Sequence, residues 1–132
     1  MVEDKTPTTL EQKWAQRAFC AVDKVSHKSD SGDFKKSEYL SFAKSFPNLI
    51  HSCGLIQALA FAQSKNKTVF LADLSFVMNG EKKYELIIEE SRKATITKYL
   101  QLSRHTLAAA EWIKRYAEAL LKEDGDHNDS CS

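Results

Sequence analysis

The stretch PNLIHSCGLIQALAFAQSK, residues 47–65, decides the fold of this chain. If the stretch is helical, apolar side chains occupy nearly every face of the helix, and only isolated polar residues interrupt them before Lys65. A helix that is apolar all round is normally buried all round. The sequence therefore predicts a central core helix from Pro47 to Lys65, with the other helices packed around it.

Pro47 and Gly54 are expected to shape the backbone of this stretch. Pro47 suits the first turn of a helix, where its missing N–H has no partner to lose, and it disfavours the α conformation at Phe46. We therefore expect the preceding helix to end at Phe46 and to meet the central helix at a sharp corner. Gly54 would lie in mid-helix at a cost of about 1 kcal/mol relative to alanine, which the close approach of a crossing backbone would offset.

The same stretch is a poor candidate for a membrane span. Asn48, His51 and two glutamines are too polar for one, and no second stretch of this kind follows. The N-terminus lacks the basic and then apolar pattern of a signal peptide. The three cysteines cannot all pair, and we expect buried, reduced thiols. These features predict a cytoplasmic protein.

On either side of this stretch, apolar residues recur at the 3.6-residue period of amphipathic helices. We expect helices at about residues 10–27, 34–46, 69–79, 81–91 and 95–122, the first capped by Thr8 or Thr9. Asn79-Gly80 is also typical of a β-hairpin turn, but its apolar flanks do not alternate as strands would. The predicted fold is an all-α bundle of about six helices, in a single domain spanning residues 9–122.

The charges of the chain are unevenly distributed. Residues 1–8 are expected to be loose, and residues 123–132 to form an acidic, disordered tail. Six of the eighteen acidic residues lie in these two end segments. Residues 5–122 therefore carry nineteen Lys and Arg against twelve Asp and Glu, a net charge of +7. A basic body of this kind favours a polyanionic partner, although such a charge can also serve solubility.

Four cations form a row on the first predicted helix. At about 100° per residue, their side chains fall within about 60° of arc, and no acidic residue shares it. We name this row the basic strip, and its members are Lys13, Arg17, Lys24 and Lys28. A second cationic group, on the last predicted helix, comprises Arg104, Lys114 and Arg115. Both groups are candidate contacts for nucleic-acid phosphates, and the alternative is a solvated polar face.

The sequence contains no pattern that indicates catalysis. Phosphate-binding loops, nucleophile elbows and H-E-x-x-H are all absent, and the four histidines lie in different segments. We therefore predict no catalytic residues, no metal and no cofactor. An enzyme that uses His51 is disfavoured because no partner base or acid can be named. Trp14 adjoins the basic strip and could stack on a base, but its spacing favours a place in the core.

Three stretches, residues 46–61, 10–25 and 98–121, together resemble the small helical subunit of the type III-B CRISPR Cmr effector complex. FPNLIHSCGLIQALAF, residues 46–61, is similar to the central P-x-x-I-x-x-x-G-L-x-Q-x-L-A-F signature of that family. The opening LEQKWAQRAFCAVDKV resembles the first helix of the family, and KYLQLSRHTLAAAEWIKRYAEALL its closing W-x-K-R helix. The likeness covers residues 10–121, but the acidic tail is not part of the pattern.

The resemblance implies a non-catalytic subunit. In that family the small subunit stacks with its own copies in a minor filament, beside the backbone subunits that hold the guide RNA. It helps to hold the target RNA, while RNA cleavage belongs to the backbone subunit and signalling chemistry to the large subunit. The implied partners are these two subunits, further copies of the chain, and guide or target RNA. The alternative is a helical adaptor that binds proteins only.

Overall fold

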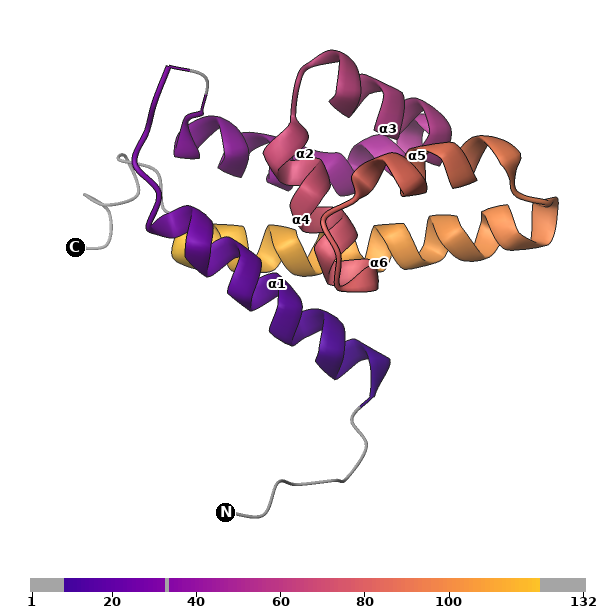
Figure 1. The fold of residues 1–132 in the computed structure, drawn as a ribbon, viewed down its shortest axis with the longest axis horizontal. Coiled ribbons are helices and arrows are strands. Elements are labelled where there is room, and N and C mark those ends of the chain that lie inside the picture. The colour runs from indigo at the N-terminus through magenta and orange to yellow at the C-terminus, as the bar shows by residue number, and fades with distance from the viewer. Residues whose placement is uncertain (1–8, 33, 122–132) are drawn as a thin grey trace.

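The computed structural model describes residues 9–32 and 34–121. These residues form six helices and no strand (Figure 1), which confirms the predicted all-α bundle. The predicted loose segment at residues 1–8 and the acidic tail at 123–132 lie outside the described residues. The helices are α1 (Leu10–Ser26), α2 (Lys36–Cys53), α3 (Leu55–Ser64), α4 (Thr68–Asn79), α5 (Tyr84–Lys93) and α6 (Ile96–Leu120).

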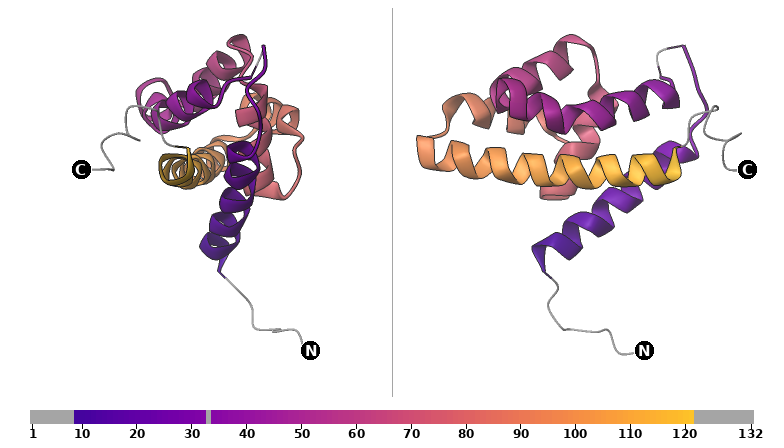
Figure 2. Two further views of the ribbon diagram at one scale, coloured as in Figure 1. Left: turned by 90° about the vertical axis from the view of Figure 1, so that its left-hand side faces the viewer. Right: turned by 180° about the vertical axis from the view of Figure 1, so that it is seen from behind.

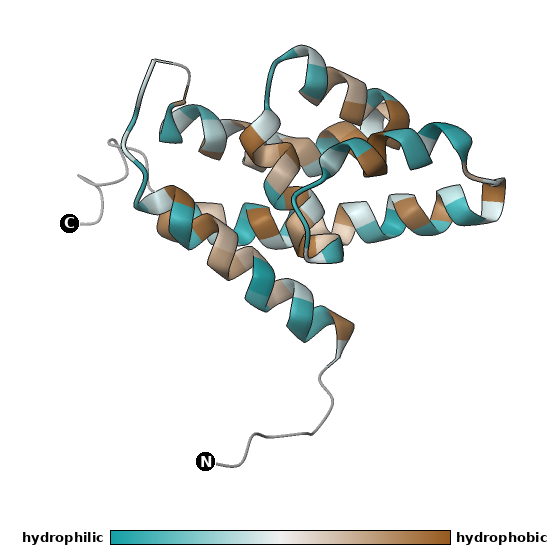
Figure 3. Cartoon of the chain, viewed as in Figure 1, coloured by the Kyte–Doolittle hydropathy of each residue, from teal (hydrophilic) through white to brown (hydrophobic). Residues whose placement is uncertain are grey.

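The longest helix, α6, forms the base on which the others pack. Helices α1, α2 and α4 all contact it, and Figure 2 shows α2 running alongside α6 while α1 crosses it obliquely. Three alanines on the inner face of α6, Ala109, Ala110 and Ala117, are fully buried. Small side chains there allow the backbones of the neighbouring helices to come close. Figure 3 shows hydrophobic and hydrophilic residues alternating along α1 and α6, as expected for helices with one buried face.

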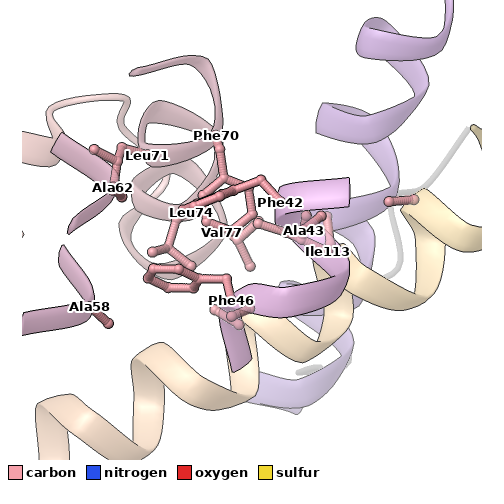
Figure 4. Close-up of a cluster of buried hydrophobic side chains, with 14 of the residues drawn as sticks. Phe42, Ala43, Phe46, Ala58, Ala62, Phe70, Leu71, Leu74, Val77 and Ile113 are labelled. Atoms are coloured by element: carbon pink, nitrogen blue, oxygen red, sulfur yellow. The ribbon is translucent and has the colours of Figure 1, made fainter. Parts of the chain in front are cut away.

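An aromatic cluster between α2 and α4 forms the centre of the core (Figure 4). The Phe46 side chain is completely buried. The centroid of its ring lies 5.5 Å from that of Phe42 and 5.0 Å from that of Phe70. The rings of Phe46 and Phe70 meet edge to face, a preferred geometry for aromatic pairs. The apolar residues of α2 thus lie in one continuous buried face.

This buried face corrects the predicted boundary at Pro47. Helix α2 continues through Pro47, which is itself buried, and ends at Cys53. Pro47 removes one hydrogen bond from the helix. However, Phe46 on one side of it and Ile50 on the other both pack into the core, and this burial keeps the helix intact. The predicted corner at Phe46 is therefore wrong.

The break in the chain comes at Gly54. Its φ of 86° and ψ of 164° lie in a region that is open essentially to glycine alone. Gly54 ends α2 and begins α3, so the predicted single helix from Pro47 to Lys65 is wrong. A Cβ at Gly54 would meet only the Tyr99 hydroxyl, at 3.8 Å, so no crossing backbone explains the glycine.

The stretch is also less buried than predicted. His51 and Cys53 are exposed at the end of α2, and the side chains of Ile56 and Phe61 in α3 are each 43% exposed. Cys20 is half-buried, so the expectation of buried thiols fails for both cysteines described. The helix breaks at Gly54, and the two shorter helices each turn one face to the core and the other outward.

The ends of α1 and α4 agree with the sequence. Thr9 caps α1 in a capping box, in which its side chain accepts from the Gln12 N–H and the Gln12 side chain accepts from the Thr9 N–H. Gly80 ends α4 in the left-handed conformation, with its N–H bonded to the Phe76 carbonyl. Asn79-Gly80 is thus a helix stop and not a hairpin.

Candidate nucleic-acid interface

The basic strip runs along the flank of α1, beside the buried face of the helix, and Lys28 lies just beyond the end of the helix. Helix α1 buries Trp14, Ala18, Ala21, Val22 and Val25, and this burial fixes the orientation of the strip. Its three lysines are exposed and Arg17 is half-buried. Within the described part of the chain, none of the four forms an ion pair. The lysine charges are therefore available to an external anion.

Arg17 has a structural partner. Its Nη1 donates a 3.2 Å hydrogen bond to the carbonyl of Val77, in the last turn of α4. Its guanidinium also lies 3.6 Å from the position that a Cβ at Gly80 would take. A cation at a helix C-terminus satisfies free carbonyls and complements the helix dipole. Arg17 therefore fastens α1 to α4, and its remaining N–H groups continue the strip.

Lys28 ends the strip against an aromatic ring. Its ammonium group lies 4.7 Å from the centre of the Phe34 ring, in the segment that leads into α2. This distance is within the range of a cation–π interaction, which favours the charged amine without neutralising it. Lys28 is therefore held at a defined place while its charge stays exposed.

A buried carboxyl lies near the same surface. Asp73 of α4 is only 4% exposed, and its Oδ2 accepts a 2.7 Å hydrogen bond from the Tyr39 hydroxyl. Burial raises the pKa of Asp73 to about 6. The hydrogen bond from Tyr39 and the charges of Lys82, Lys28 and Lys24 act in the opposite direction. Burial, followed by the charge of Asp73, raises the pKa of Tyr39 well above its usual value.

The charge of Lys82 acts on Asp73 together with two members of the basic strip, a relation that the sequence did not predict. Lys82 lies in the loop between α4 and α5, where helical periodicity could not relate it to the basic strip. In the structure it acts on the same carboxyl as Lys24 and Lys28. The sequence does offer a weak signal: Asp73 is the single charge in the apolar run VFLADLSFVM. An acid in such a run requires compensation from elsewhere in the chain.

The second predicted cationic group lies on α6. Arg104 and Arg115 are exposed and Lys114 is half-buried. Helix α1 meets α6 through its other side, where the rings of Phe19 and Tyr116 lie 5.6 Å apart at 77°. Arg17 points instead to α4. Among the described residues, no hydrogen bond or ion pair joins the two cationic groups.

Other kinds of site find little support in the described residues. Trp14 is buried in the core, as its spacing predicts, and offers no stacking platform. In residues 9–32 and 34–121, no group of three His, Cys, Asp or Glu side chains is placed to hold a metal ion. No helix described by the structure combines the length and the apolar character that crossing a membrane requires.

Comparison with known proteins agrees with this architecture. A family model described as a CRISPR-associated protein (Cas_Cmr5) matches residues 10–120. The CRISPR system Cmr subunit Cmr5 of Thermus thermophilus is 39% identical over 118 residues, which cover 87% of this chain and 98% of the relative. The crystal structure of a CRISPR-associated Cmr5 family protein from the same organism superimposes with a TM-score of 0.77 at 36% identity. That match covers 86% of this chain and 98% of the crystallised one.

The family match spans nearly all of the described residues, and the likenesses in sequence and in fold point to the same family. The resemblance read from the central and closing signatures is thereby confirmed. The chain belongs to the Cmr5 family of CRISPR-associated proteins.

Proposed function

We propose that this chain is the small subunit of a cytoplasmic CRISPR Cmr ribonucleoprotein complex, in which it contacts RNA through the basic strip. It has no catalytic role of its own. It stacks with its copies beside the backbone subunits that hold the guide RNA, and it helps to hold target RNA for cleavage by other subunits. The family membership supports the place in the complex, and the basic strip carries the contact with RNA.

The chemistry of the strip suits a phosphate backbone. Lys13, Lys24 and Lys28 are spread over about four turns of helical spacing, and their charges are not compensated by ion pairs among the described residues. Lysine binds phosphate as a point charge and reads no base. Binding should therefore be indifferent to RNA sequence and should weaken as salt concentration rises. Arg104, Lys114 and Arg115 form a separate contact.

A protein-only adaptor is the alternative, and one observation favours it. Large apolar side chains are exposed on α5 and on the first turns of α6: Leu86 is 56% exposed, Ile96 79% and Leu100 50%. Exposed apolar side chains of this size, where they gather in one patch, are typical of a surface that contacts another protein. In the complex proposed above, this end would meet another subunit. In a protein-only adaptor, contact through this apolar end would be the entire function of the chain.

The test is a variant that neutralises the strip without disturbing the fold. Lys13, Lys24 and Lys28 are each changed to Gln, while Arg17 is kept because it holds α4. The matched control changes Lys44, Arg92 and Lys98, which are also exposed, to Gln. RNA association is measured over a salt series, in the assembled complex and with the chain alone. We expect the strip variant to lower the salt slope by about 0.7 for each phosphate that the strip no longer neutralises.

The control variant should leave the slope unchanged. Equal slopes for the wild type, the strip variant and the control would contradict the contact with RNA. Capture of the tagged chain from its host, with and without RNase, distinguishes a protein-only adaptor from an RNA-contacting subunit. Partners that stay bound after RNase treatment, together with equal slopes, would establish a protein-only role.

A further inference from the structure

A hollow of about 610 Å³ opens between the segment before α2 and the turn from α3 to α4. This volume lies within the roughly 300–1,000 Å³ of sites for small ligands. Aromatic rings, including Phe34 and Phe42, line the hollow together with three lysines, Lys35, Lys65 and Lys67. No role for it follows from the sequence, because its walls come from segments far apart in the chain.

Two of the three lysines of the hollow lie over aromatic rings. The ammonium of Lys67 lies 5.6 Å from the centre of the Phe42 ring, and that of Lys65 lies 5.7 Å from the centre of the Phe61 ring. The rings of Phe42 and Phe61 are stacked at 13°, with centroids 6.3 Å apart. The two cations therefore sit beside one aromatic platform, which limits their freedom before any ligand arrives.

The turn between α3 and α4 places the two cations. Asn66 lies between them with a φ of 56°, a left-handed conformation that asparagine tolerates better than most residues. Asn66 reverses the chain, so that Lys65 and Lys67 both line the hollow. Glu38 is the acidic residue in the described lining, against three lysines. The described lining of the hollow thus carries a net positive charge beside aromatic rings.

A ligand that suits both the lysines and the aromatic rings is anionic and carries a flat ring. Lysines neutralise a phosphate, and aromatic rings pack against a base irrespective of its identity. We propose that this hollow binds one nucleotide, with its phosphate at Lys65 and Lys67 and its base against the partly exposed ring of Phe34. Glu38 in the lining disfavours a second phosphate by charge repulsion.

The hollow adjoins the basic strip. Lys28, the last member of the strip, lies over Phe34, and Phe34 lines the hollow. A strand that follows the strip along α1 therefore reaches the hollow at its end. In this form the inference rests on the proposed function, and the ligand is a nucleotide of the bound RNA. A free mononucleotide has the same chemistry and is the other possible source of the ligand.

The two sources are separated with one pair of variants. Lys65 and Lys67 are changed to Gln, and the matched control changes Lys44 and Arg92, both exposed and outside the hollow, to Gln. Thermal melting confirms that both variants fold. AMP and inorganic phosphate are titrated into the full chain by calorimetry. In parallel, single-stranded RNA containing 4-thiouridine is photo-cross-linked, and the linked peptides are identified by mass spectrometry.

If the hollow takes a nucleotide of RNA, cross-links fall in peptides 34–42 or 65–70. The Lys65/Lys67 variant then loses about tenfold in binding, the equivalent of one charged hydrogen bond, while the control does not. If it takes a free nucleotide, AMP binds more tightly than phosphate and only the Lys65/Lys67 variant weakens it. Cross-links elsewhere, together with AMP binding that is absent or unchanged by the variant, would overturn the proposal.

An outcome that contradicts the nucleotide site in the hollow is distinguishable from one that contradicts the proposed function. The variant of the basic strip changes the salt slope of RNA association whether or not the hollow is occupied. If the strip variant changes the salt slope but the Lys65/Lys67 variant changes neither AMP binding nor RNA binding, the RNA contact stands and only the nucleotide site is contradicted. A strip that does not respond, with AMP still bound in the hollow, would leave only the free-nucleotide form.

Discussion

The Tyr39 hydroxyl donates a 2.7 Å hydrogen bond to Oδ2 of Asp73 and so joins α2 to α4 inside the core. Both side chains are almost fully buried, and burial raises the pKa of each. At neutral pH the Asp73 carboxyl is ionised in a place that disfavours its charge. The charges of Lys82, Lys28 and Lys24 offset part of that cost.

This arrangement predicts a pH dependence of stability. The folded carboxyl keeps its proton up to a pKa of about 6, whereas an unfolded one loses it near its usual 3.8. The native state therefore binds more protons in this window, and its stability falls as pH rises through it. The shift corresponds to about 3 kcal/mol. Asp73→Asn should remove this loss, so that the variant gains on the wild type, by up to about 3 kcal/mol, as pH rises from about 4 to about 7.5.

Urea unfolding of both proteins across this range measures the difference. A gap that does not change with pH would show that Asp73 does not titrate in the core.

Tyr39→Phe tests the effect of the Tyr39 hydroxyl on the pKa of Asp73. The hydrogen bond from Tyr39 lowers the pKa of Asp73, so its loss should raise that pKa further above its usual value. The pKa is measured from the carboxyl carbon shift of Asp73 by NMR. A titration midpoint that stays in place, or that moves down, would contradict the role given to the hydroxyl.

Gly54 should not tolerate a side chain. Because the cost lies in its backbone conformation, Gly54→Asn should lower the free energy of unfolding by about 1–3 kcal/mol. Gly80 is the matched control, since its φ of 79° and ψ of 5° are left-handed, a conformation that asparagine adopts. Gly80→Asn should cost less than about 1 kcal/mol. Chemical denaturation measures both, and equal losses would show that the backbone at Gly54 is not the constraint.

Arg17 should contribute to stability as well as to charge. Arg17→Gln removes the hydrogen bond to the Val77 carbonyl and a cation at the end of α4. The expected loss is about 0.5–1.5 kcal/mol in the free energy of unfolding. Lys13→Gln removes the same charge from an exposed position and should change stability little. If both variants melt alike, Arg17 is only another member of the strip.

Phe46 should be among the most sensitive positions in the core. Its ring is completely buried, and Phe46→Ala should cost about 3–5 kcal/mol because it leaves a cavity between α2 and α4. Phe61→Ala deletes a ring that is 43% exposed and should cost considerably less. Differential scanning calorimetry of the two variants checks the order, which would be reversed if α3 carried the core as the sequence suggested.

The sequence predicted those elements whose signals are local. The first helix follows from one apolar stripe and a threonine cap, and the end of α4 follows from Asn79-Gly80. The corner at Pro47 was wrong because the rule for proline is local, whereas the face that keeps α2 continuous is tertiary. Phe46 and Ile50, on either side of Pro47, each gain more from burial in the core than one missing hydrogen bond costs.

The candidate site was predicted in part for the same reason. Helical spacing placed Lys13, Lys24 and Lys28 on one face, and the structure leaves all three exposed. Helical spacing could not show that Arg17 reaches Val77, which lies 60 residues further along the chain. Nor could it relate Tyr39 to Asp73, 34 residues apart. Such pairings depend on how helices cross, which periodicity within a single helix does not contain.

The position of α6 in the chain has a consequence for synthesis. The faces that α1, α2 and α4 turn inward all pack against this last helix. While the ribosome is still making residues 96–120, those faces can pack only against one another and lack α6, so the core cannot close. We therefore expect the nascent chain to acquire its native packing only at the end of translation. Until then its apolar surface depends on chaperones, and a chain stopped short of α6 is a substrate for proteolysis.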